Sequence, residues 1–199
     1  TCIKQDRCLF ADLNFSLKSG QIMQLAGPNG AGKTSLLRII AGFASPDEGD
    51  IFWRENSITK SYDEFARELL FIGHKTGVNA QLTALENVRF WLQIQGYNND
   101  QDLYPLLANI GLVGLEDVPV RTLSAGQQRR VALLRLWLND AKLWILDEPF
   151  TALDKSGVAF LQDRFTSHLE NGGAILLTTH QDLTTHFNDL QTVTLEYRH

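Results

Sequence analysis

Residues 27–34 read Gly27-Pro28-Asn29-Gly30-Ala31-Gly32-Lys33-Thr34 and match the phosphate-binding pattern G-x-x-x-x-G-K-[ST] at every position. An apolar run from Ile22 to Ala26 precedes this stretch, and an apolar helical pattern from Ser35 to Ala41 follows it. The order of strand, glycine-rich loop and helix distinguishes a phosphate-binding loop (P-loop) from an ordinary glycine-rich turn before a helix. The sequence therefore predicts a P-loop at this position.

The residue types in this loop suit the phosphates of a nucleotide. Glycines let backbone N–H groups approach phosphate oxygens without a Cβ clash, and the N-terminus of the following helix adds its positive dipole. We expect Lys33 to reach the β- and γ-phosphates and the Thr34 hydroxyl to bind Mg²⁺. The full set of expected nucleotide-binding residues is Gly27, Pro28, Asn29, Gly30, Ala31, Gly32, Lys33, Thr34 and Ser35.

The composition is that of a globular protein. With 199 residues, 44% hydrophobic and 21% charged, the chain is expected to form one domain, or one domain with a subdomain. The formal net charge of −5 gives no reason to expect a general affinity for nucleic acid or anionic membranes. No apolar run reaches about 18 residues, so no transmembrane helix is expected, and no signal peptide is visible.

The first residues carry two cysteines and no initiator methionine. Cys2 and Cys8 match no metal or redox spacing, and we interpret them as reduced thiols in strands of a cytosolic protein. Because the chain opens on Thr1, we expect some N-terminal residues to be missing.

Short strands are predicted on both sides of the P-loop. Residues 1–17 are expected to form two strands around a polar turn at residues 4–7, and the second strand is expected to include the alternating stretch 13–17. Gly42 is expected to end the P-loop helix. Further strands are expected at residues 51–53, 69–72, 143–147, 174–178 and 192–197.

The pattern becomes mainly helical between about His74 and Val120. Thr83-Ala84-Leu85-Glu86 is a capping box that opens a helix ending at Gly96, and a second helix is expected from about Asp100 to Ile110. We therefore expect residues 74–120 to be a helical subdomain. It would be inserted into an α/β core formed by residues 1–73, which include an N-terminal antiparallel β subdomain, and residues 121–199.

Two helix starts are predicted in the second half. Ser124-Ala125-Gly126-Gln127 is a second capping box and opens a helix to about Leu138. Asp154 can cap the helix that follows the buried strand ending at Asp147.

Four further motifs follow the P-loop in order and resemble those of ATP-binding cassette (ABC) proteins. They are the signature Leu123-Ser124-Ala125-Gly126-Gln127, the strand end Asp147-Glu148-Pro149, the D-loop Ala152-Leu153-Asp154, and the switch-histidine loop Thr178-Thr179-His180. The resemblance covers essentially the whole chain. It implies an ABC-type P-loop NTPase with a RecA-like core, ATP and Mg²⁺ as cofactors, and ATPase activity.

The resemblance also assigns roles to the motif residues. It implies that Asp147 holds Mg²⁺ together with Thr34, that Glu148 polarises the attacking water, and that His180 contacts the γ-phosphate. The signature helix of a second copy would face that γ-phosphate, which implies a head-to-tail dimer with two ATP molecules between the chains.

Two positions depart from the usual cassette. A glutamine usually ends the strand that leads into the helical subdomain, and the corresponding residue here is His74. His74 is expected to donate to a water or to the γ-phosphate, and the alternative is an ordinary loop histidine. No aromatic residue stands at the expected place in the first hairpin to stack on adenine, because Phe10 alternates into the strand close to the P-loop.

The compact chain resembles the ATP-binding subunits of the bacterial cytochrome c maturation (haem export) system. The resemblance rests on Ile72-Gly73-His74, on Leu82 to Asn87, on the signature followed by Gln128-Arg129-Arg130, and on Asp147 to Phe150. It implies membrane partners of the CcmB and CcmC type and a peripheral place on the cytoplasmic face of the inner membrane. Any haem contact is expected on those partners, because the chain has no Cys-Pro or Cys-x-x-Cys-His element.

Other functions stay open at this point. The nearest alternative is an ATPase subunit of another ABC transporter with lipid, drug or metal cargo. A soluble ABC ATPase acting on ribosomes or DNA is less well supported, because such proteins usually carry two cassettes or long coiled-coil insertions, and this chain has neither.

Overall fold

The computed structural model describes residues 1–4, 7–96 and 102–196. Two compact units make up the chain. One comprises Thr1–Gly73, Ala141–Glu148 and His168–His199, and the other comprises His74–Asp140 and Pro149–Ser167. We refer to them as the sheet unit and the helical unit.

A five-stranded parallel sheet forms the centre of the sheet unit, with strand order β6-β7-β8-β3-β9. The strands are β3 (Ile22–Ala26), β6 (Leu69–Ile72), β7 (Leu143–Asp147), β8 (Ala174–Thr178) and β9 (Gln191–Thr194). Every residue of β7 and β8 is buried, as expected for apolar strands inside a parallel sheet. Because parallel strands end at the same edge, the residues that follow β3, β7 and β8 lie close together.

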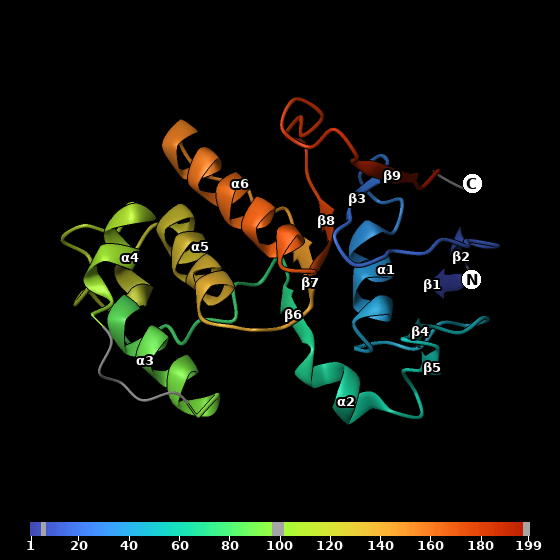
Figure 1. Cartoon of the computed structure of the whole chain (residues 1–199), viewed down its shortest axis with the longest axis horizontal. Helices are drawn as coiled ribbons and strands as arrows, with labels where there is room; N and C mark the ends of the chain where they lie inside the picture. The colour runs from blue at the N-terminus through green and yellow to red at the C-terminus, as the bar shows by residue number, and fades with distance from the viewer. Residues whose placement is uncertain (5–6, 97–101, 197–199) are drawn as a thin grey trace. The chain divides into compact units, whose positions relative to one another are not determined.

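Two short hairpins and two helices complete the sheet unit (Figure 1). The hairpins are β1 (Cys2–Lys4) with β2 (Arg7–Phe10) and β4 (Phe52–Trp53) with β5 (Asn56–Ser57). The helices are α1 (Lys33–Ile40) and α2 (Tyr62–Arg67). Buried residues of β2, β3, α1, β7 and β8 form one hydrophobic cluster, so the P-loop helix is fixed by the core beneath it.

The helical unit contains α3 (Ala84–Ile94), α4 (Tyr104–Asn109), η1 (Val120–Thr122), α5 (Ala125–Leu133), η2 (Leu134–Trp137) and most of α6 (Lys155–Glu170). Both predicted capping boxes are present: Thr83 and Glu86 cap α3, and Ser124 and Gln127 cap α5. No helix among the described residues is long and apolar enough to cross a membrane.

The structure corrects several predicted elements. Residues 13–17 are not a strand: β2 ends at Phe10, and Asp12 takes a left-handed backbone with φ 57° that breaks the extended chain. The helix expected up to Leu138 is α-helical only to Leu133 and continues as a 3-10 turn. The helix expected from about residue 100 is α4, which begins at Tyr104 within the described residues. The terminal strand expected at residues 192–197 is β9, which ends at Thr194. Residues 100–101 and 197 lie outside the described residues.

Candidate nucleotide-binding site

The P-loop connects the end of β3 to the start of α1. Gly27, Gly30 and Gly32 all have positive φ, at 137°, 83° and 99°. A Cβ at Gly27 would collide with the Leu195 carbonyl oxygen, and one at Gly32 would lie 3.3 Å from the Phe10 ring. The first turn of α1 has no side-chain cap, so its backbone N–H groups are available to an anion.

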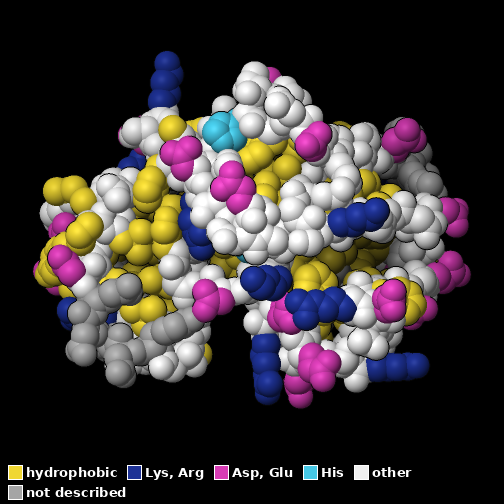
Figure 2. All heavy atoms as spheres, viewed as in Figure 1, with side chains coloured by type: hydrophobic (Ala, Val, Ile, Leu, Met, Phe, Trp, Pro, Cys, Tyr) yellow, Lys and Arg dark blue, Asp and Glu magenta, His cyan; other side chains and the backbone are white. Residues whose placement is uncertain are grey.

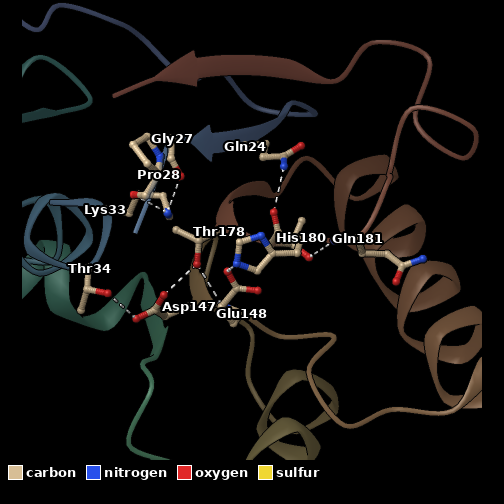
Figure 3. A network of polar contacts seen from close by, with 11 residues as sticks. Gln24, Gly27, Pro28, Lys33, Thr34, Asp147, Glu148, Thr178, His180 and Gln181 are labelled. Carbon is tan, nitrogen blue, oxygen red and sulfur yellow. Dashed lines mark hydrogen bonds and ion pairs between the residues drawn. The ribbon is translucent and has the colours of Figure 1, made fainter. Parts of the chain in front are cut away.

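The Lys33 side chain folds back over the loop. Its Nζ donates to the Gly27 carbonyl at 2.6 Å and to the Pro28 carbonyl at 3.1 Å (Figure 3). These contacts hold an ammonium group against the loop, where the charge of a phosphate would be neutralised.

The Thr34 hydroxyl and the Asp147 carboxylate meet at the end of β7. Thr34 Oγ1 donates to Asp147 Oδ2 at 3.0 Å, and Asp147 is 5% exposed. A hydroxyl and a carboxylate oxygen are the hard ligands that Mg²⁺ takes in nucleotide sites, usually with waters and phosphates as its remaining ligands. The residues present therefore fit Mg²⁺.

Glu148 and His180 lie just beyond the ends of β7 and β8. His180 Nε2 is 3.5 Å from Glu148 Oε1, a distance that makes an ion pair whenever the imidazole is protonated. Glu148 has φ 52°, a backbone conformation uncommon outside glycine. This turn directs the Glu148 side chain away from the strand, toward His180 (Figure 3).

Two polar residues of this network had no role assigned from the sequence, although Thr178 is the first residue of the switch-histidine motif. Thr178 Oγ1 donates to Asp147 Oδ1 at 2.7 Å and accepts from the Glu148 N–H at 3.0 Å. Gln24 Nε2 donates to the Thr179 carbonyl at 3.1 Å, one residue before His180. Each is a polar side chain in an otherwise apolar strand, and that feature of the sequence could have identified both.

The signature and the D-loop lie in the helical unit. Ser124 and Ala125 are exposed, so the N-terminus of α5 is accessible to a ligand. A Cβ at Gly126 would lie 2.9 Å from the Cβ of Ala152, whose φ is 63°. The signature and the D-loop therefore pack together, and Gly126 leaves the space that this contact needs.

Asp154 caps α6 as predicted. Its Oδ1 accepts from the Gly157 N–H at 3.0 Å, and this hydrogen bond, assisted by the Arg130 guanidinium 3.7 Å away, holds the pKa of Asp154 below its usual value. The contact fixes the end of the D-loop at the start of the helix.

The two positions at which the sequence departs from the usual cassette lie near β6 and near the first hairpin. His74 is exposed and lies two residues beyond the end of β6, where Ile72 pairs with Leu146. Phe10 is 6% exposed and packs under the P-loop, so its ring is not available to stack on a base.

A hollow of about 890 Å³ lies elsewhere in the sheet unit, between α1 and the segments 12–17 and 46–53. Its lining includes no P-loop residue and neither Asp147 nor Glu148. This cavity is therefore separate from the P-loop and from the carboxyl end of β7.

Known proteins resemble this chain over most of its length. Residues 10–151 match the family model described as ABC transporter. The chain is 53% identical over 195 residues to the cytochrome c biogenesis ATP-binding export protein CcmA of Aliivibrio fischeri, covering 98% of this chain and 96% of the relative. It is 54% identical over 183 residues to CcmA of Yersinia pseudotuberculosis, covering 92% and 84%.

Two solved structures show the same fold. A structure of an ATP-binding subunit of an ABC transporter superposes with a TM-score of 0.84 at 25% identity, covering all of this chain and 85% of the other. An ATP-binding cassette solved as a dimer in a post-hydrolysis state, bound to ADP and phosphate, superposes with a TM-score of 0.76 at 24% identity, covering 96% and 89%.

Proposed function

The chain belongs to the ABC transporter family and, within it, to the cytochrome c biogenesis ATP-binding export proteins, and we propose on this basis how its residues couple ATP hydrolysis to transport. The chain is an ATPase subunit of an ABC transporter complex. The proposal rests on a series of hydrogen bonds that runs from Thr34 through Asp147 and Thr178 to the Glu148 N–H, at the strand ends beside the P-loop.

ATP binds through its phosphates to Gly27–Ser35. Lys33 exchanges its two carbonyl contacts for the β- and γ-phosphates, and the N–H groups at the start of α1 donate to phosphate oxygens. Thr34 and Asp147 would hold Mg²⁺, which would neutralise charge on the phosphates.

Hydrolysis needs a water aligned with the γ-phosphate and a group that accepts its proton. Glu148 is that group, because its side chain is 25% exposed and projects beyond the strand end. His180, 3.5 Å from it, orients the carboxylate and reaches the γ-phosphate. Phosphoryl transfer depends mainly on such positioning and on charge.

A second copy completes each site. At the exposed N-terminus of α5 the capping box uses the N–H groups of Ser124 and Gln127, so the N–H groups of Ala125 and Gly126, beside small side chains, are the ones offered to an anion. In the head-to-tail dimer this helix end meets the γ-phosphate held by the partner's P-loop. The D-loop, Ala152–Asp154, follows the same closure because it packs on Gly126.

Membrane subunits of the CcmB and CcmC type are the proposed partners, and the chain sits at the cytoplasmic face of the inner membrane. The proposed docking surface is the loop from His74 to Ala80 with the helical subdomain, residues 74–120. Exposed apolar side chains support this assignment (Figure 2); in the helical unit they include Phe90, Ile94, Tyr104 and Val113. His74, exposed at the start of this loop, would link the partner to the site.

Haem delivery for cytochrome c assembly is the proposed task of the complex. The alternative is another cargo, such as a lipid, drug or metal. A ribosome- or DNA-directed role has no support in the charge distribution, because the net charge is −5 and acidic and basic side chains are intermixed on the face drawn in Figure 2.

The test of function is genetic and biochemical. Deletion of the gene is expected to abolish holo-cytochrome c, and the wild-type chain, but not Lys33→Ala, is expected to restore it. The tagged chain should co-purify with a multi-spanning membrane protein. Normal holo-cytochrome c after deletion, with loss of another transported compound, would instead assign a different cargo.

A further inference from the structure

We propose that Thr178 is a positioning residue for ATP hydrolysis, whose single hydroxyl sets both the Mg²⁺-binding carboxylate of Asp147 and the backbone of Glu148. This inference rests on the proposed ATPase function of the same site. Thr178 is the last residue of β8 and stands directly beside Asp147 in the register of β7 with β8.

The hydroxyl of Thr178 donates one hydrogen bond and accepts another. Its hydrogen goes to Asp147 Oδ1 at 2.7 Å, and its oxygen accepts the Glu148 N–H at 3.0 Å. Since Thr34 donates to the other Asp147 oxygen, Oδ2, the carboxylate is held on both sides and its rotation is fixed. One oxygen is thereby turned toward the P-loop, where the metal is expected.

Glu148 needs such a restraint because its backbone is unusual. Its φ of 52° is rare for a residue with a side chain, and such conformations persist where surrounding contacts overdetermine them. The Glu148 N–H is held by two acceptors of one residue, the Thr178 hydroxyl and the Thr178 carbonyl, the latter at 3.1 Å. Both acceptors together fix the direction in which the Glu148 side chain leaves β7.

Packing alone does not call for a hydroxyl here. The other four residues of β8 are Ala, Ile, Leu and Leu, and Thr178 is 0% exposed, so valine would fill the same volume. A buried hydroxyl is costly unless it is hydrogen-bonded. Among the residues that the structure describes, the partners of this hydroxyl are the Asp147 carboxylate and the Glu148 N–H. We infer that the hydroxyl serves the geometry of the site.

The test compares Thr178→Val, which keeps the shape, with Thr178→Ser, which keeps the hydroxyl. In the assembled transporter, Thr178→Val is expected to lower kcat at least tenfold while KM for ATP changes less than threefold. Thr178→Ser should stay within about threefold of wild type in kcat. Thr59→Val, at an exposed turn in the same unit, is the matched control and should behave as wild type.

Two readouts do not depend on turnover. In the full chain without nucleotide, the Glu148 amide is expected to exchange hydrogen faster in Thr178→Val than in wild type or Thr178→Ser. The gain in ATP affinity on adding Mg²⁺ should also be several-fold smaller in Thr178→Val, while affinity for Mg²⁺-free ATP is unchanged.

The possible results distinguish a positioning role of Thr178 from a packing role, and both from a failure of the proposed ATPase function. If Thr178 only packs, Thr178→Ser will lose more activity and thermal stability than Thr178→Val, and the proposal is overturned. It is equally overturned if Thr178→Val keeps wild-type kcat and wild-type exchange at Glu148. Failure of the wild-type chain to bind ATP would instead refute the proposed function.

Discussion

His180 Nε2 lies 3.5 Å from Glu148 Oε1, just beyond the ends of the two neighbouring strands β8 and β7. The His180 side chain is 76% exposed and the Glu148 side chain 25%, so the imidazole is open to a ligand while the carboxylate is partly covered. This pairing gives the site one group that can meet a γ-phosphate and one that can accept a proton from water.

Replacing His180 by alanine is expected to lower kcat for ATP hydrolysis by about 10²-fold, the effect of removing one well-placed polar group at a reaction centre. ATP affinity should change little, because Lys33 and the P-loop amides still hold the phosphates. Steady-state rates and nucleotide titration of the same preparations will check this. His186→Ala is the control, because the His186 ring makes an edge-to-face contact with Phe187.

Replacing Lys33 by alanine is expected to weaken ATP binding about 10- to 100-fold, because a hydrogen bond to a charged group contributes about 1.5–3 kcal/mol. Equilibrium titration with a fluorescent ATP analogue will measure the change. Lys60→Ala, on an exposed turn of the same unit, should bind ATP as wild type does. Unchanged ATP affinity in Lys33→Ala would contradict the role of the P-loop in binding the phosphates.

Replacing Asn87 by alanine is expected to lower the free energy of unfolding by about 2 kcal/mol. Asn87 is 0% exposed, and its amide bonds the Asn79 N–H, the Asn79 carbonyl and the Thr83 carbonyl. Truncation leaves the Asn79 N–H without the acceptor described here, whereas the Asn79 and Thr83 carbonyls still accept from the Leu82 and Asn87 N–H groups. A buried backbone group without its partner typically costs about 1–3 kcal/mol. Urea unfolding will measure this loss, with Asn14→Ala at an exposed position as the control. Equal unfolding midpoints for Asn87→Ala and wild type would contradict the role assigned to Asn87.

Asp154 is expected to make stability depend on pH at the acid end. Its pKa is lowered in the folded chain, chiefly by the Gly157 N–H, so the ionised form favours folding. That contribution is complete above the unfolded pKa of about 3.9 and is lost as pH falls through the lower folded pKa. Thermal melting between pH 2 and 6 should show a shallower acid limb for Asp154→Asn than for wild type, and parallel curves would contradict the assignment.

The sequence predicted the sheet strands near the site because each has a local signal. The runs at β3, β6, β7 and β8 are apolar and short, and the two capping boxes mark the starts of α3 and α5. The segment 13–17 shows the limit of periodicity: its alternation is that of a strand, but the left-handed backbone at Asp12 ends β2 before it.

The contacts of the site were less predictable. Motif order placed Thr34, Asp147, Glu148 and His180 in one site, but it said nothing of the residues that hold them. The contacts of Thr178 and Gln24 depend on how neighbouring strands are aligned. Thr178 pairs with Asp147 of β7, and Gln24 lies on β3, the strand next to β8. Register comes from the packing of the whole sheet, which a linear motif does not contain.

The central claim is that ATP on the P-loop is hydrolysed with Glu148 as the base, in a dimer closed by the signature helix of a second copy. Glu148→Gln, assembled with its membrane partners and also as the isolated chain, tests it most directly by parallel measurement of ATP turnover and of mass by light scattering. We predict that turnover falls by about 10²-fold or more while ATP binding persists, and that ATP drives the isolated Glu148→Gln chain to a dimer. Hydrolysis at the wild-type rate, or a chain that stays monomeric when saturated with ATP, would contradict the account.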